Sequence, residues 1–386
     1  MRGHIKQRSK GSWSIVLDLG RDPSTGKRKQ QWVTIRGTKK EAESKLAELQ
    51  HQMDSGGYIK PSKETLGKFL ERWLDDYIST QVRATTLEAY RQRGKHLINA
   101  LGHIPLSELR PEHIHQYYRE KSRFLSASTL IKHHNLLREA LSHAVKWQNV
   151  VRNVAQAVDP PRVNRKEMKA LTGSEVHRLL EACIDKPWYP IFHTLTWTGL
   201  RRSELLGLRW RDVDLLMATI RVVQTLQQLN TGEFIFQDPK TSKGRRSIAL
   251  SPASCLVLSA HREKQERDAE ALGAPLTDET LVFSHPDGSP RVPSTLTLAF
   301  RRLSRRVGLQ GVRLHDLRHT MASLYLEQGV NPKTVAERLG HASVTITLDL
   351  YSHCLPGVQE AAAEQFDSAM DAARLLSTKG STAYIG

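Results

Sequence analysis

The sequence predicts a multidomain, mainly α-helical protein that carries small β-sheets. A length of 386 residues is enough for two or three domains. Residues 55–64 and 158–170 are rich in Gly, Pro, Ser or basic residues and are interpreted as linkers. Helical periodicity dominates beyond the first linker, whereas β-branched and aromatic runs stand near the start and within the last segment. The predicted divisions are residues 1–57, 64–157 and 170–376, with a tail at 377–386.

The first segment is expected to form a small sheet with one helix against it. Residues 13–19 and 31–36 are strand-like, and the basic stretch between them is full of turn formers. Thr38 followed by Glu41 is a capping box, which predicts the start of a helix. The face that this helix would bury carries Ala42, Leu46, Leu49 and Met53.

The second segment is expected to be a block of four amphipathic helices. The first helix carries one apolar stripe, formed by Leu66, Phe69, Leu70, Trp73 and Tyr77. Thr85 and Glu88 predict a capping box for the second helix, which should end at Gly102. Pro111 should open the third helix, and residues 126–147 should form the fourth.

The third and largest segment is expected to be mainly helical with a few strands. Thr172 and Glu175 should cap its first helix. Residues 218–226, 232–237 and 245–250 are strand-like. A final helix is expected after Tyr351, with an Ala-rich apolar side.

The net charge indicates a polyanionic partner. The formal charge is +17, and residues 1–63 carry 14 Lys and Arg against 6 Asp and Glu, an excess of eight. Nearly half of the excess positive charge therefore lies in the first sixth of the chain. A soluble surface needs charge but not this bias, so we expect the chain to bind nucleic acid.

Other classes of protein are excluded by composition. No apolar run approaches the ~20 residues of a membrane span, and the start has no signal-peptide core, so we expect a cytoplasmic protein without a membrane partner. Cys183, Cys255 and Cys354 lie far apart, which argues against a disulfide framework or a structural zinc site.

Three short stretches of the last segment carry residues suited to chemistry on phosphate. Residues 196–210 place Arg201 after a Thr-Gly turn, where a helix N-terminus normally favours acids. Residues 314–320 place His315 and Arg318 three positions apart, on one helix face. Residues 339–353 hold His341 and, ten positions later, Tyr351. Each stretch alone is a weak signal, because most such side chains are solvated or structural.

In this order the three stretches closely resemble the tyrosine recombinase (phage integrase) family. The family signature has an arginine in a Thr-Gly-Leu-Arg turn, a hairpin lysine, a His-x-x-Arg pair, a His or Trp after Leu-Gly, and a tyrosine nucleophile. The matching residues are Arg201, Lys240, His315 with Arg318, His341 and Tyr351. Lys240 is favoured over Lys243 as the hairpin lysine, and Glu204 resembles the acid that braces the first arginine.

The resemblance covers nearly the whole chain and implies its architecture. It implies an arm-type DNA-binding domain at 1–57, a helical core-binding (SAM-like) domain at 64–157 and an α+β catalytic domain at 170–376. It also implies cleavage and rejoining of double-stranded DNA through a 3′-phosphotyrosine, without metal, ATP or other cofactor. Implied partners are core-type and arm-type attachment sites, three further copies in a homotetramer, an excisionase and a DNA-bending host protein.

Two alternatives remain open. A type IB topoisomerase shares the phosphotyrosine chemistry, although the basic first domain and the four-helix block favour a recombinase. A catalytically inactive DNA-binding regulator on the same scaffold would need positive charge but not a phenol at position 351.

Overall fold

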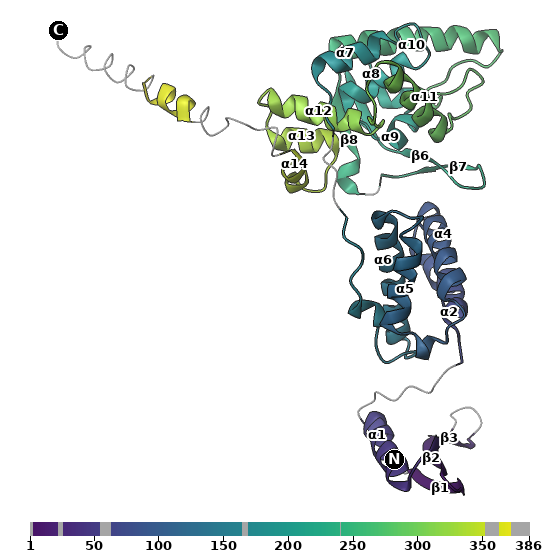
Figure 1. Ribbon diagram of the computed structural model, residues 1–386. Coiled ribbons are helices and arrows are strands. Elements are labelled where there is room, and N and C mark those ends of the chain that lie inside the picture. Colours follow the sequence, from purple (N-terminus) through teal and green to yellow (C-terminus); the bar gives the residue numbers. More distant parts are fainter. Residues whose placement is uncertain are drawn as a thin grey trace, which may run out of the picture. The chain divides into compact units, whose positions relative to one another are not determined.

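The computed structural model describes residues 3–21, 26–54, 63–163, 169–239, 241–351 and 363–371 (Figure 1). The chain divides into two compact units, residues 1–165 and 166–386. The predicted fold class is confirmed, because most elements are helices and the sheets have two or three strands. Within the described ranges, no helix is both long enough and apolar enough to cross a bilayer.

The chain begins with a three-stranded antiparallel sheet and one helix. The strands β1 (Gly3–Ser9), β2 (Ser12–Arg21) and β3 (Arg28–Arg36) lie in sequence order, and α1 (Lys39–Asp54) packs on them. Ile15 of β2 pairs with Ile5 and Val33 and is fully buried. Strand β1 was not predicted, because Ile5 is the only large apolar residue in its sequence GHIKQRS.

The capping box at the start of α1 is confirmed. The backbone N of Thr38 donates to Glu41 Oε2 at 2.8 Å, and the backbone N of Glu41 donates to Thr38 Oγ1 at 3.3 Å. Of the predicted face, Ala42 and Leu49 are buried. The predicted linker at 55–64 lies almost entirely outside the described residues.

The helical block comprises α2 (Leu66–Arg72), α3 (Ser79–Gln81), α4 (Ala84–Leu101), α5 (Pro111–Lys121) and α6 (Ala127–Lys146), with a π-helical stretch at Trp73–Ile78. Leu66, Phe69, Leu70 and Trp73 of the predicted stripe are fully buried. Pro111 is the first residue of α5, as predicted, and Ser126 caps α6 through a side-chain hydrogen bond.

The predicted capping box of the second helix is wrong. Helix α4 begins at Ala84, and its cap residue Arg83 makes no side-chain capping hydrogen bond, so Thr85 and Glu88 lie inside the helix. The helix does end at Gly102, but with a right-handed φ of −64°. A Cβ at Gly102 would clash with Ile98 O, which favours glycine there, and Gly102 O accepts from the backbone N of Gly67 at 3.0 Å.

Two buried histidines of α6 belong to the core of this block. Tyr117 Oη lies 2.7 Å from His133 Nδ1, and Tyr118 Oη lies 2.6 Å from His134 Nδ1. Burial lowers the pKa of His133 to about 4. Neutral imidazoles paired with phenols satisfy buried polar groups, which is a structural role.

The second unit holds the remaining helices and two small sheets. Its helices are α7 (Gly173–Glu181), α8 (Tyr189–Thr198), α9 (Arg202–Leu206), α10 (Pro252–Ala271), α11 (Pro293–Arg306), α12 (Asp316–Glu327), α13 (Pro332–Leu339) and α14 (Val344–Tyr351). Its strands are β4 (Val213–Asp214), β5 (Thr219–Val222), β6 (Thr225–Gln228), β7 (Phe234–Gln237) and β8 (Arg246–Ala249), in sheets β4-β5-β8 and β6-β7. The predicted Thr172–Glu175 cap of α7 is confirmed.

The packing of the second unit brings distant segments together. Helix α12 packs on α8 and α13, α14 packs on α13, and α13 also contacts β8 (Figure 1). The ends of α8 and α13 and the start of β8 therefore meet. Residues 363–371 form a further helix whose residues are all exposed, and the predicted tail at 377–386 lies outside the described part.

Candidate active site

Arg201 is positioned by the turn between α8 and α9. Helix α8 ends at Gly199, whose φ of 65° suits a residue without a side chain. Arg201 is then the cap residue of α9, and Glu204 lies one turn further on. Arg201 Nη1 donates to Glu204 Oε1 at 2.6 Å, and the backbone N of Arg201 donates to Glu204 Oε2 at 2.9 Å. The carboxylate offsets a cation that would be unfavourable at a helix N-terminus.

Arg318 is held at the meeting point of α8 and α13. The residue is 3% exposed. Its Nη1 donates to Gly199 O at 2.6 Å, and its Nη2 donates to Leu339 O. Two backbone carbonyls from different helices thus fix the plane of the guanidinium group. By contrast, the side chain of Arg201 is 39% exposed and accessible to a ligand.

Three histidines lie close to these arginines. Burial, then the charges of Arg318 and Arg201, lower the pKa of His341 to about 4. Desolvation and Arg318 also lower the pKa of His315, against a smaller raising effect of Asp316. The ring of His319 meets that of His315 edge-on, with centroids 4.9 Å apart. These imidazoles are consequently neutral at pH 7, the form that can accept a proton or a hydrogen bond.

His341 is oriented by a buried threonine. Its Nδ1 lies 2.8 Å from Thr347 Oγ1 in α14, and Thr347 is fully buried. This contact fixes the ring with Nδ1 toward the protein. The sequence gives no sign of the pairing, because a threonine six positions from a histidine is an ordinary residue.

Four of the predicted residues therefore come together: Arg201, His315, Arg318 and His341. Tyr351 is the last residue of α14, the helix that carries Thr347, and its side chain lies outside the described part. Lys240 also lies outside it. Lys243, the alternative lysine, donates from Nζ to Ala342 O at 2.9 Å, next to His341.

Sequence reasoning missed Arg246. This arginine at the start of β8 has a side chain only 6% exposed, and both of its terminal nitrogens contact the carboxylate of Glu204. A buried arginine beside the predicted site is a strong signal in the structure. In the sequence it is one of two consecutive arginines that begin the strand-like run 245–250.

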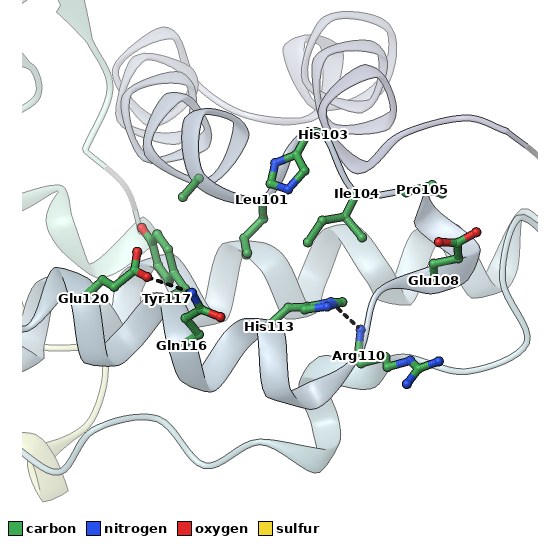
Figure 2. Close-up of a pocket in the computed structure, with 11 residues that line it drawn as sticks. Leu101, His103, Ile104, Pro105, Glu108, Arg110, His113, Gln116, Tyr117 and Glu120 are labelled. Carbon is green, nitrogen blue, oxygen red and sulfur yellow. Dashed lines mark hydrogen bonds between the residues drawn. The ribbon is translucent and has the colours of Figure 1, made fainter.

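Among the described cavities, the one in Figure 2 lies in the helical block. Its volume is about 460 Å³, and two pairs of its polar lining groups bind one another. His113 Nδ1 accepts from the backbone N of Arg110 at 3.2 Å, and Gln116 Nε2 donates to Glu120 at 2.9 Å (Figure 2). Another cavity, of about 570 Å³, is lined by Arg201, Arg202 and Gln228 and is therefore adjacent to the candidate active site. The described residues include no group of three or more His, Cys, Asp or Glu side chains placed to hold a metal ion.

Comparison with known proteins identifies three family models along the chain. Residues 169–356 match the "Phage integrase family", residues 65–122 match "Phage integrase, N-terminal SAM-like domain", and residues 5–53 match "Arm DNA-binding domain". Among curated relatives, a "Tyrosine recombinase XerC-like" protein of Caldanaerobacter subterraneus is 27% identical, covering 89% of this chain and 93% of its own length. The ICEBs1 integrase of Bacillus subtilis is 26% identical over 94% of this chain and 99% of its own.

Solved structures with the same fold include two DNA-bound integrases. The Tn1549 transposon integrase in complex with a circular intermediate DNA has a TM-score of 0.68 at 20% identity, covering 78% of this chain and 99% of its own. A lambda integrase tetramer bound to a Holliday junction has a TM-score of 0.56 at 20% identity, covering 90% of this chain and 94% of its own.

Proposed function

Because the chain belongs to the phage integrase family of tyrosine recombinases, we propose that it is a site-specific DNA integrase that cleaves and rejoins strands through a 3′-phosphotyrosine. One observation carries the proposal most directly. Arg201 and Arg318, 117 positions apart, both bond to the short segment Leu339–Gly340 that precedes His341. A binding protein needs no such convergence of fixed cations and neutral imidazoles.

The two guanidinium groups fit the transition state of phosphoryl transfer. A phosphodiester repels an incoming oxyanion, and the five-coordinate transition state places more charge on the non-bridging oxygens. Guanidinium groups stay charged at any working pH and bind such oxygens bidentately. Donors fixed before the reaction commonly contribute the largest share of catalysis.

The remaining roles complete the balance of bonds and protons. Tyr351 attacks phosphorus, the bond to the 5′-oxygen breaks, and the 3′ end becomes attached to the phenol. His315, kept neutral by its lowered pKa, accepts the phenolic proton or hydrogen-bonds the phosphate. Lys240, or alternatively Lys243, protonates the leaving 5′-oxygen, and His341 donates to the phosphate. Glu204 braces Arg201. The phosphotyrosine conserves the bond energy, so no high-energy cofactor is required.

We propose a type of DNA site for each of the three predicted domains. Residues 1–57 would bind arm-type sites, whereas residues 64–157 and 170–376 would bind core-type sites on double-stranded DNA. A homotetramer on DNA, an excisionase and a DNA-bending host protein complete the proposal, with the cytoplasm and its nucleoid as the place of action. The lambda integrase tetramer on a Holliday junction supports the assembly, since its fold is similar.

A nicked suicide substrate tests this function. The duplex carries the core attachment site of the encoding element and a nick just beyond the cleavage position, so that the freed end diffuses away. We expect the full chain to form a covalent complex, and Tyr351→Phe to bind the same DNA without one. Absence of a complex under conditions of specific binding would favour an inactive DNA-binding regulator. Relaxation of supercoiled plasmids that lack the site would favour a type IB topoisomerase.

A further inference from the structure

Arg246 is a buried guanidinium group in the second unit, and the proposed reaction has not yet used it. It bonds to three chain segments at once. Nη1 and Nη2 contact Glu204 Oε1 at 3.2 Å and Oε2 at 2.8 Å. Nε donates to Arg338 O at 2.7 Å, and Nη1 also donates to Gly244 O at 3.1 Å. Burying a charge requires such complete pairing.

The carboxylate of Glu204 is shared between two arginines. Oε1 accepts from Arg201 Nη1 at 2.6 Å and from Arg246 Nη1, while Oε2 accepts from the Arg201 backbone and from Arg246 Nη2. Arg246 thus takes the bidentate position, and the Arg201 side chain keeps a single contact with the acid. Without Arg246, the carboxylate would be available for a bidentate pair with Arg201, which is the stronger geometry. That pair would draw the Arg201 guanidinium away from a bound phosphate and neutralise it.

The other two contacts of Arg246 lie beside the remaining catalytic groups. Arg338 O is at the end of α13, two residues before Gly340 and three before His341. Gly244 O lies in the segment between β7 and β8, one residue after Lys243. Gly340, with φ +66°, leaves space for this arrangement, because a Cβ there would come 3.0 Å from Arg246 Nη1 and 2.9 Å from Lys243 O.

We propose that Arg246 is a positioning residue of the strand-cleavage reaction, which occupies Glu204 so that Arg201 stays turned toward the scissile phosphate. The inference rests on the proposed function and deepens it. We assign Arg246 no contact with DNA, because its terminal nitrogens are bonded to Glu204 and Gly244 O and its Nε to Arg338 O. Its effect should pass through Arg201 and therefore depend on the charge of the non-bridging oxygens.

The test replaces Arg246 by Met in the full chain, with Arg245→Met as the matched control. Arg245 is the adjacent residue and is also ion-paired, to Asp238 at 2.9 Å, but its side chain is 60% exposed. The covalent complex is timed on two suicide substrates, one with an ordinary scissile phosphate and one with a methylphosphonate there. The methyl group replaces a non-bridging oxygen and makes the phosphorus centre neutral, so a misplaced Arg201 matters less.

We expect Arg246→Met to slow cleavage of the phosphate substrate by about 10²-fold, to slow the methylphosphonate substrate clearly less, and to leave DNA affinity unchanged. Arg245→Met should change neither the cleavage rate on either substrate nor the DNA affinity. When Arg201 is already replaced by Lys, Arg246→Met should cause no further loss in the rate of cleavage of the methylphosphonate substrate. The reason is that residues acting as one unit have non-additive effects.

Three results for Arg246→Met would overturn the inference: no loss of cleavage rate, an equal loss on both substrates, or a loss that adds fully to that of Arg201→Lys. If Arg246→Met does not fold, Arg246→Lys takes its place in the same comparison of the two substrates. Lysine keeps the charge but cannot bind both carboxylate oxygens of Glu204. If the wild-type chain forms no covalent complex on either substrate, the proposed function fails. A wild type that reacts alongside an unaffected Arg246→Met chain refutes only the role of Arg246.

Discussion

At the scale of single residues, Glu204 determines the charge balance of the candidate active site. Its side chain is 2% exposed and lies between Arg201 and Arg246. Burial alone would raise its pKa, but the hydrogen bonds and charge of Arg246, followed by the charge of Arg201, lower that pKa to about 2. The folded chain therefore stabilises the ionised carboxylate.

Replacing Glu204 by Gln should lower the free energy of unfolding at pH 7 by about 3–5 kcal/mol, because two guanidinium groups lose their counter-charge. The folded pKa is depressed, so the stabilisation is complete above the ordinary value of 4.5 and is lost as the pH falls toward 2. The difference between wild type and Glu204→Gln should thus shrink over that window. Urea unfolding at pH 7 and pH 3, with hydrogen exchange resolved to residues 169–339, measures it.

Glu279→Gln is the matched control for this measurement. Glu279 also pairs with two arginines, Arg209 and Arg211, but its side chain is 60% exposed. Exposed pairs contribute about 0–1 kcal/mol, so this variant should scarcely change stability. A loss for Glu204→Gln no larger than for Glu279→Gln would contradict the assigned role.

Predictability from sequence differs among the site residues for a physical reason. Arg201, His315, Arg318 and His341 stand in local motifs with fixed spacing, which a single sequence displays. The pairing of Arg246 with Glu204 spans 42 positions and exists only after the chain folds. The contact of Thr347 with His341 depends on how α14 packs. Lys240 and the phenol of Tyr351 remain predictions.

At the scale of elements, two of the three predicted Thr capping boxes are confirmed and the one at Thr85 is wrong. Thr38 and Thr172 each cap a helix as predicted. Helix α4 was misplaced because its own cap, Arg83, has no such side-chain bond. Strand β1 was missed because it is held by pairing with β2 and shows little apolar alternation.

The contact between α2 and the end of α4 yields a prediction with an unusual sign. Alanine in a helix is normally about 1 kcal/mol better than glycine, yet Gly67→Ala should destabilise the helical block by about 1–3 kcal/mol. A Cβ at Gly67 would lie 3.0 Å from Gly102 O and 3.2 Å from its Cα, and backbone atoms cannot move aside cheaply.

Gly173→Ala provides the comparison for Gly67→Ala. Gly173 is also the near-terminal residue of a helix, α7, but a Cβ there meets nothing within 4 Å. Thermal unfolding of both variants should show a lowered transition for Gly67→Ala and an unchanged or raised one for Gly173→Ala. An equally stable Gly67→Ala chain would show that the two backbones can separate.

At the scale of the whole molecule, positive charge is concentrated in the first segment. Residues 1–63 hold an excess of eight of the +17 net charge. Within this segment, residues 5–53 match the arm DNA-binding model. The candidate active site lies in the other compact unit, residues 166–386. DNA binding at arm-type sites and chemistry at core-type sites should therefore be separable.

Deleting residues 1–57 should abolish binding to arm-type sites and reduce recombination between separate DNA molecules, while covalent cleavage of a core site persists. Affinity for DNA should also depend less steeply on salt, since each lost phosphate contact removes about 0.9 from the logarithmic slope. Fluorescence anisotropy across a salt series and the suicide-substrate assay measure these effects. Arm-site binding that survives the deletion would show that the domain is assigned wrongly.

The close fit around Gly340 also bears on how the gene can vary. Hydrogen is the only side chain that leaves the Arg246 guanidinium and the Lys243 carbonyl where they are. Every single-base missense change of a glycine codon introduces a β-carbon, even the mildest one, to alanine. Point mutation thus has no neutral amino-acid step at this codon, and only synonymous drift is free.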